Sequence, residues 1–315
     1  MRRVLGSVLL VGALLSGVAP TSSSNVGARP VPGAPRCPIF PSNNPWNRRV
    51  DRLPVHPRSD AIVASIGLDE GLHPDFGSGK WEGAPIGIPF TTVPRSLKKV
   101  PVRFGYASES DPGPYPIPSD APIEGGRSST GDRHVIVVDR GLCRLYELFD
   151  AHLKDGGKRW VAGSGATWDL KSNHLRPKGW TSADAAGLPI LAGLARYSEV
   201  RDGDIDHALR FTVSRTRRAF VYPARHFASS FTSRKLPAMG QRLRLKKGYD
   251  ISGFPRQARI VLRALKRYGM FVADNGSDWY ISGAPSPGWN NDALHELGRV
   301  VGRRFEVVDA GSLKP

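Results

Sequence analysis

Apolar and polar residues alternate most regularly over residues 132–150, and this pattern predicts two short strands joined by a tight turn at Arg140-Gly141. Side chains along a strand point alternately to opposite faces. In the second strand, one face therefore carries a carboxylate in an apolar row: Cys143, Leu145, Glu147 and Phe149. A carboxylate in such a row costs free energy unless it is paired or protonated. Glu147 is thus either a structural carboxylate held by an arginine or by backbone amides, or an acid with a raised pKa in a cleft.

Helical spacing of apolar residues marks two further segments. Residues 59–66 carry an apolar stripe, and residues 255–268 carry one opposite a row of arginines. Another helix is predicted near 292–300. A helix start is also predicted at Thr181, because Asp184 follows three residues later as in a capping box.

Shorter alternating segments predict strands over 88–93, 99–106, 159–170, 207–213, 217–226, 270–274 and 305–309. Asn275-Gly276 is a strong hairpin signal, so residues 278–283 are predicted to pair with 270–274. Asp202-Gly203 predicts a second turn of this kind. Because most strands precede the long helices, we expect a β-rich α+β fold. Its antiparallel sheets are sandwich-like or jelly-roll-like, with two late helices packed on them.

The N-terminal 28 residues have the pattern of a secretory signal peptide. Arg2 and Arg3 precede an apolar stretch that is too short to span a bilayer, and cleavage is expected after Ala28. Residues 29–36 are rich in Pro, Gly and Ala and predict a flexible linker. Residues 37–315 are then expected to form a single globular domain that is secreted and free of membrane.

Two cysteines, Cys37 and Cys143, are present in the chain. In the oxidising environment that follows export, two cysteines are expected to form one disulfide. The alternative is a pair of buried thiols. A disulfide here joins the N-terminal arm to the strand pair at 132–150.

The charge is strongly positive, with 45 Lys and Arg against 28 Asp and Glu and a formal net charge of +17. Such a balance favours anionic partners. However, the basic residues are spread along the chain without a long Lys/Arg block, which indicates a mostly solvated surface. We therefore expect a polysaccharide or another extracellular polymer as the partner, rather than nucleic acid, and a monomeric protein.

Several carboxylates stand on or beside the predicted strands, with tryptophans between them. Cleavage of a glycosidic bond needs two carboxyl groups, one as the acid and one as the base or nucleophile, and aromatic rings stack on sugars. We predict Glu147 as the general acid or base, with Glu124 or Asp150 as its partner. The expected substrate-binding residues are Trp168, Trp180, Tyr222 and Arg210. The alternative is that these aromatic side chains only fill the core.

Histidines add a second candidate chemistry. His207 and His226 lie on predicted strands and are expected to support catalysis, although a hydrogen-bonded structural histidine is the alternative for each. No HExxH or CxxC spacing is present, so neither a metal nor another cofactor is expected. Residues 202–206 resemble half of a calcium loop, but the glycine and the final glutamate of that motif are missing, which favours a turn.

Several longer strings, among them LHPDFGSG, GWTSADAAGLPIL and DNGSDWYISG, together resemble a family of exported bacterial proteins that is common among actinobacteria. The resemblance covers about residues 37 to 310. It implies export and a single domain, and it implies no catalytic residue. From the residues, we expect a secreted carbohydrate-active protein, either a glycoside hydrolase or a polysaccharide lyase. The alternatives are a non-catalytic binding protein for acidic wall or extracellular polymers, and a peptidase or esterase.

Overall fold

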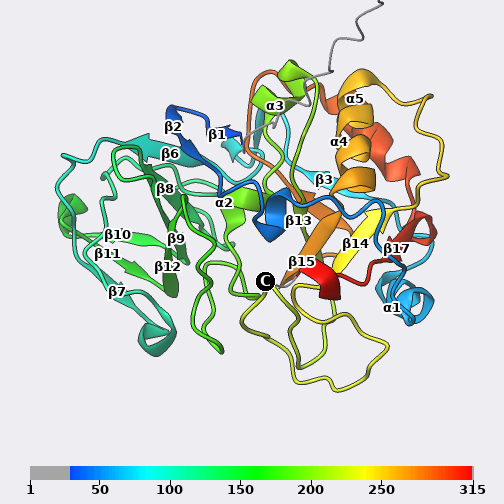
Figure 1. Ribbon diagram of the computed structural model, residues 1–315. Coiled ribbons are helices and arrows are strands. Elements are labelled where there is room, and N and C mark those ends of the chain that lie inside the picture. The colour runs from blue at the N-terminus through cyan, green and yellow to red at the C-terminus, as the bar shows by residue number, and fades with distance from the viewer. Residues whose placement is uncertain (1–28, 314–315) are drawn as a thin grey trace, which may run out of the picture.

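The structure is a computed structural model that describes residues 29–313 of the chain. The expected signal peptide therefore lies outside the described residues. The fold is β-rich α+β, as predicted, with 27% strand and 19% helix. Figure 1 shows the four-stranded and three-stranded sheets on one side of the molecule, and the six-stranded sheet with α4 and α5 on the other. No helix within the described part is long and apolar enough to cross a bilayer.

The sheets are mixed rather than purely antiparallel. The six-stranded sheet has the order β17 (Phe305–Val307), β14 (Arg242–Leu245), β15 (Met270–Asn275), β13 (Leu209–Val213), β16 (Tyr280–Ser282) and β3 (His73–Asp75). The four-stranded sheet has the order β12 (Ser164–Asp169), β9 (Arg144–Phe149), β8 (Val135–Asp139) and β6 (Phe90–Val93). The three-stranded sheet has the order β10 (His152–Lys154), β11 (Arg159–Ala162) and β7 (Val102–Phe104). Two small hairpins pair β1 (Pro30–Val31) with β2 (Ala34–Pro38), and β4 (Lys80–Trp81) with β5 (Ala84–Pro85).

The helices are short apart from α4. They are α1 (Ser59–Ile66), α2 (Ile190–Gly193), α3 (Tyr197–Asp202), α4 (Arg256–Arg267) and α5 (Asn291–His295). Single 3-10 turns are η1 (Pro45–Asn47), η2 (Ala107–Glu109), η3 (Asp155–Gly157), η4 (Glu296–Arg299), η5 (Gly302–Arg304) and η6 (Gly311–Leu313). The helices predicted at 59–66 and 255–268 are confirmed, and α5 with η4 covers the one predicted near 292–300.

The predicted strand pair at 132–150 is confirmed as β8 and β9. Both of its faces are buried, because Ile136 and Val138 join the larger hydrophobic core while Val135 and Val137 join a smaller one. The turn between the strands is longer than predicted. The Asp139 side chain shapes it by accepting hydrogen bonds from two successive backbone N–H groups. Ile136 pairs directly with Glu147, so the Glu147 side chain points towards the larger core.

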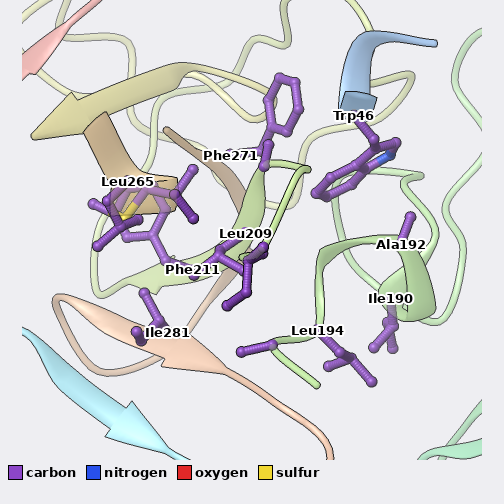
Figure 2. Close-up of a cluster of buried hydrophobic side chains, with 14 of the residues drawn as sticks. Trp46, Ile190, Ala192, Leu194, Leu209, Phe211, Leu265, Phe271 and Ile281 are labelled. Carbon is purple, nitrogen blue, oxygen red and sulfur yellow. The ribbon is translucent and has the colours of Figure 1, made fainter. Parts of the chain in front are cut away.

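The larger core joins the two main sheets through α2 and the first 3-10 turn. Figure 2 shows the rings of Trp46 and Phe271 beside each other, with Ala192 of α2 below Trp46. The rings of Trp46 and Phe271 lie 4.8 Å apart in an edge-to-face arrangement, which is favourable for aromatic pairs. β13 is buried within this core through Leu209 and Phe211.

The predicted hairpin at Asn275-Gly276 is wrong, because β13 lies between β15 and β16. β13 runs parallel to β15 and antiparallel to β16. The loop after β15 caps the end of β13 instead of reversing onto β15. In this loop the Ser277 carbonyl accepts from the Thr212 hydroxyl, and Asp278 accepts from the Ser214 backbone. A long-range apolar strand has thus displaced the local pairing that the turn favours.

Three further predictions from local sequence, at 181–189, 217–226 and Asp202-Gly203, are also wrong. Residues 181–189 form no helix, because the Asp184 side chain binds Arg210 from a distant strand. Residues 217–226 are irregular rather than a strand. The Asp202-Gly203 pair ends α3, where Gly203 takes a left-handed conformation, and the nearby aspartates pair with arginines such as Arg29. Residues 159–170 do form strand, but the chain changes sheet between β11 and β12.

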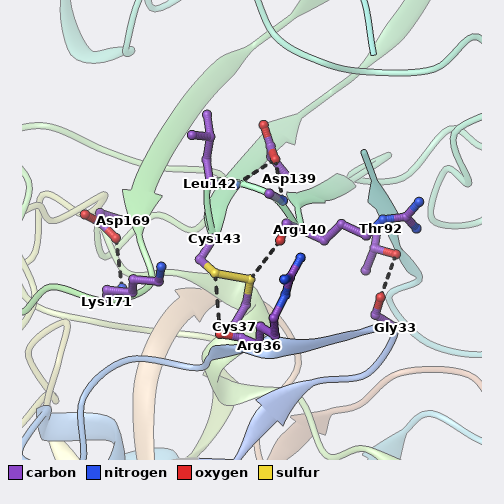
Figure 3. The surroundings of a disulfide bond; sticks show 11 residues. Gly33, Arg36, Cys37, Thr92, Asp139, Arg140, Leu142, Cys143, Asp169 and Lys171 are labelled. Carbon is purple, nitrogen blue, oxygen red and sulfur yellow. Dashed lines mark hydrogen bonds between the residues drawn. A yellow bond between two sulfur atoms is a disulfide. The ribbon is translucent and has the colours of Figure 1, made fainter. Parts of the chain in front are cut away.

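The expected flexible linker at 29–36 is also wrong, because these residues begin an ordered hairpin. Val31 and Ala34 are buried, and the hairpin turns at Gly33, which has a φ of 82°. The predicted disulfide between Cys37 and Cys143 is confirmed and is shown in Figure 3. By anchoring β2 beside the start of β9, it reduces the entropy that is lost when the arm becomes ordered.

Candidate active site

The outer strands of the six-stranded sheet present a row of polar side chains. His73 on β3 pairs with Tyr280 on β16, and Asp75 pairs with Ser282 two residues further along. Paired residues point to the same face, while Ile281, between Tyr280 and Ser282, packs in the larger core. Arg210 on β13 extends this row by donating a hydrogen bond to the Ser282 hydroxyl. This end of the sheet thus carries a group of polar side chains on one face.

A cavity of about 540 Å³ opens beside this polar face, and we call it the first cavity. It is lined by His73 and Asp75 of β3, Tyr280 of β16, Trp81 of β4 and Glu124. Glu124 reaches it from the end of a proline-rich loop, where its backbone N–H donates to the His134 carbonyl at the start of β8. Two carboxyl groups from distant parts of the chain therefore line the same cavity.

Glu124 is held as a carboxylate by a buried histidine. His134 Nδ1 lies 2.5 Å from Glu124 Oε2, and His134 Nε2 lies 3.1 Å from the Ala183 carbonyl oxygen. Both partners are hydrogen-bond acceptors, so both ring nitrogens donate and the ring is an imidazolium. Burial alone lowers the pKa of His134, but the charge of Glu124 and the hydrogen bond raise it to about 9. Burial raises the pKa of Glu124, but the charge of His134 outweighs this and lowers it.

The pKa of Asp75 is shifted in the opposite direction to that of Glu124. The side chain of Asp75 is open to the cavity, but the surrounding protein desolvates it and raises its pKa, and the negative charge of Glu124 raises it further. The environment therefore shifts the pKa values of the two carboxyl groups in opposite directions, upwards for Asp75 and downwards for Glu124. Divergent pKa values in two neighbouring carboxyl groups are typical of sites that use one as an acid and the other as a base or nucleophile.

Aromatic side chains border the same cavity. The ring of His73 stacks on that of Tyr280 with centroids 4.0 Å apart. Trp81 is 73% exposed, which is unusual for so large an apolar side chain. It stands on the β4–β5 hairpin, where both turn residues, Glu82 and Gly83, have positive φ. The hairpin thus presents an open indole face at the edge of the cavity.

The first cavity has an acidic lining. Its charged side chains are Asp75 and Glu124, together with the titratable His73 and His295, and no Lys or Arg is among the described residues that line it. Burial lowers the pKa of His73, and the neighbouring charge of His295 lowers it further. This electrostatic environment is unsuited to a ligand with a carboxylate or phosphate group at the reacting position.

A second cavity of about 330 Å³ lies between the two main sheets. It is lined by Glu109, Asp132, His226 and Asp274. Burial raises the pKa of Asp274 to about 7, and the charge of the nearby Asp184 contributes to this shift. The carboxyl oxygens of Asp274 accept hydrogen bonds from the N–H groups of Ala185 and Asn275.

Glu147 lies in neither cavity. Its side chain is fully buried, and its two carboxyl oxygens accept hydrogen bonds from the backbone N–H groups of Ile190 and Leu191, at 2.9 and 2.8 Å. It therefore caps the start of α2. Burial raises the pKa of Glu147 to about 7, although the two hydrogen bonds oppose the shift. This position matches the structural alternative for Glu147 and gives no support to the role of general acid.

The other predicted catalytic residues do not share one site. Glu124 lines the first cavity and His226 the second. Asp150 is exposed and pairs with His152 outside both cavities. His207 is buried beside Glu199, whose pKa falls to about 2: burial alone raises it, but neighbouring Arg196 and His207 outweigh that effect.

The predicted substrate-binding residues do not meet at the first cavity. Trp168 and Trp180 both face the guanidinium of Arg176, with 5.6 Å between the guanidinium carbon and each ring centroid. Arg210 is buried in a bidentate ion pair with Asp184, as part of the polar row between the two cavities. Tyr222 lines a third cavity on another part of the surface.

Sequence reasoning missed Asp75, Trp81 and Tyr280. The signal for Asp75 is the short His73-Pro74-Asp75 alternation, which is too brief to indicate a strand by itself. Trp81 follows a glycine-rich segment that is indistinguishable from any ordered loop. The pairing of β3 with β16 brings Asp75 and Tyr280 together, and Trp81 of the β4–β5 hairpin joins them in lining the cavity.

Comparison with family models, with curated proteins and with solved structures found no match. The resemblance to exported actinobacterial proteins therefore stays a prediction, and the function of the site has to follow from its geometry.

Proposed function

We propose that this protein is a secreted carbohydrate-active enzyme, a glycoside hydrolase that acts in the first cavity. The observation that carries the proposal is the pair Asp75 and Glu124, which line one cavity and have pKa shifts of opposite direction. The exposed Trp81 beside them supports a sugar as the ligand, because aromatic faces pack well on the apolar side of sugar rings.

In this mechanism Asp75 is the general acid. It donates its proton to the glycosidic oxygen as the bond between that oxygen and the anomeric carbon breaks. Glu124 acts on the anomeric carbon, either by attacking it directly or by deprotonating a water that attacks it. Water supplies the hydroxyl group of one product, and Asp75 supplies the proton of the other. His134 is a positioning residue that keeps Glu124 ionised.

A hydrolase fits the site better than a polysaccharide lyase. A lyase that acts on uronic acids has to neutralise the carboxylate of the sugar, and the first cavity offers two acidic side chains and no arginine or lysine for this task among its described lining residues. We therefore propose a neutral or amine-bearing sugar as the substrate. The disulfide supports secretion, because such bonds persist in oxidising compartments.

The test is product release from a panel of neutral, amino-sugar and acidic polysaccharides by the purified mature protein, beside Asp75→Asn and Glu124→Gln. Each substitution should lower kcat by about 10²- to 10⁴-fold, the usual contribution of a general acid or base. Asp150→Asn is the matched control, because Asp150 is exposed and outside both cavities. Circular dichroism verifies that the variants are folded.

The pH profile provides a second readout. Catalysis needs a protonated Asp75 and an ionised Glu124, so activity should be greatest at acid pH and fall on both sides. The fall in activity at alkaline pH, which reflects ionisation of Asp75, should be absent from the residual activity of Asp75→Asn. Full activity in a folded Asp75→Asn variant, or release from polyuronates alone, would contradict the proposal.

A further inference from the structure

A third cavity, of about 240 Å³, lies between the segment that precedes α1 and the start of β14. Its lining includes His56, Arg58, Arg217, Arg242 and Asp309, and we call it the basic cavity. It shares no lining residue with the first or the second cavity. Three arginines against one carboxylate give it a positive character, in contrast to the acidic first cavity.

Two of these arginines have no counter-charge. Within residues 29–313, the guanidinium groups of Arg58 and Arg217 form no ion pair and no hydrogen bond. Burial lowers the pKa of Arg217, and the positive charges of Arg58 and Arg234 lower it further. Asp309 forms no ion pair with either arginine, and its carboxylate accepts a hydrogen bond from the Gly311 backbone. Like charges therefore gather at this cavity and repel one another.

This arrangement differs from that of several buried arginines elsewhere in the protein. Buried Arg133 donates only to backbone carbonyl oxygens, but Arg196, Arg210 and Arg244 pair with the carboxylates of Glu199, Asp184 and Glu306. Arg242, at the base of the basic cavity, instead donates to three backbone carbonyl oxygens and has no carboxylate partner among the described residues. Its positive charge therefore adds to that of Arg58 and Arg217.

We propose that the basic cavity binds an oxyanion, a phosphate or carboxylate group carried by an anionic extracellular polymer. The guanidinium fork matches both groups, because it offers parallel N–H donors to two oxygens. An anion held between Arg58 and Arg217 relieves their mutual repulsion. The net charge of +17 attracts such polymers over a longer range. The protein thus holds an acidic polymer at one site while the first cavity acts on a neutral sugar.

The experiment is calorimetric titration of the mature protein with inorganic phosphate and with monomeric galacturonate, followed by a polyol-phosphate polymer and a polyuronate. The double variant Arg58→Gln/Arg217→Gln should bind at least ten-fold more weakly than the wild type. Arg103→Gln/Arg144→Gln is the control, because it removes the same charge from two exposed arginines elsewhere on the surface. The control should keep the affinity of the wild type. The polymer that binds more tightly identifies the source of the oxyanion.

Thermal stability gives an independent readout, since a ligand that binds only the folded state raises Tm. Phosphate or galacturonate should raise the Tm of the wild type and the control and leave that of the double variant unchanged. Equal weakening in the control and the double variant would show non-specific attraction and overturn the proposal, as would the absence of saturable binding. Asp75→Asn should bind normally, so failure here is separable from failure of the proposed catalysis.

Discussion

Glu147 is a buried carboxylate that caps a helix by accepting hydrogen bonds from two backbone N–H groups. It replaces the missing hydrogen-bond partners at the start of α2, where N–H groups otherwise have none. A carboxylate can accept at both oxygens, whereas an amide side chain can accept at one. The pKa of about 7 follows from complete burial, so the raised value is explained without a catalytic role.

We predict that Glu147→Gln lowers the free energy of unfolding and leaves kcat of the folded protein unchanged. One backbone N–H loses its acceptor, which costs about 1–3 kcal/mol. The pH dependence also has a defined sign. Because the pKa of Glu147 is raised from 4.5 to about 7 on folding, the stability of the wild type falls as the pH rises through this interval, by about 3 kcal/mol.

The difference in stability between wild type and Glu147→Gln should therefore be largest near pH 4 and shrink towards pH 8. Urea denaturation at several pH values measures it. A variant that is as stable as the wild type but has lost all activity would restore Glu147 as the catalytic acid.

Among single residues, the sequence nominated Glu124 as the carboxylate partner of Glu147, and Glu124 lines the first cavity while Glu147 does not. The predicted link between Cys37 and Cys143 is confirmed. Both stand out by chemistry, as a carboxylate at the end of a rigid loop and as a pair of cysteines. The ion pair of His134 with Glu124 could not be predicted, because a contact between side chains ten residues apart on different elements leaves no local pattern.

At the scale of elements, the β4–β5 hairpin is the part of the first cavity best suited to contact a polymer chain. Trp81 packs little against the protein, so its apolar ring is exposed to water, which is unfavourable. A bound sugar ring would cover this surface. Its contact should strengthen the binding of substrate and transition state equally.

We predict that Trp81→Ala raises KM for long oligosaccharides about ten-fold, since loss of an aromatic contact is worth about 1 kcal/mol or slightly more. The values of kcat and Tm should change little, and Trp81→Phe should restore most of the affinity. Steady-state kinetics on oligosaccharides of increasing length measure this. A large drop in kcat with unchanged KM would contradict a binding role for the hairpin.

Elements with strong internal periodicity were predicted well. α1, α4, β8 and β9 each bury an apolar stripe or face that their own residues define. The return strand after Asn275-Gly276 was misplaced, because a strand from sixty residues earlier has more apolar surface to bury between β15 and β16 than the turn gains by local pairing. Turn propensity is weak beside the burial of Leu209 and Phe211.

For the whole molecule, the disulfide is the main covalent constraint. It closes a loop between cysteines 106 residues apart and joins the N-terminal hairpin to the four-stranded sheet. Its loss restores freedom to the unfolded chain and releases the arm whose Val31 and Ala34 are buried.

The double variant Cys37→Ser/Cys143→Ser should be less stable by about 4–5 kcal/mol, as expected for a loop of this length. Guanidinium denaturation of the oxidised wild type and the variant provides the comparison, and the reduced wild type is the control that should resemble the variant. The variant should also be cleaved earlier by proteases near residues 29–38. Equal stability of all three would show that packing alone holds the arm.

The sequence by itself determined the β-rich α+β class, the strand pair at 132–150, the two amphipathic helices and the disulfide. These depend on composition or on patterns within a few neighbouring residues. Tertiary structure alone decided the strand order β15–β13–β16, the cap that Glu147 forms and the meeting of Asp75 with Glu124. Each of these depends on contacts between segments distant in the chain, whose free energies of burial and ion pairing exceed local preferences and leave no periodic trace in the sequence.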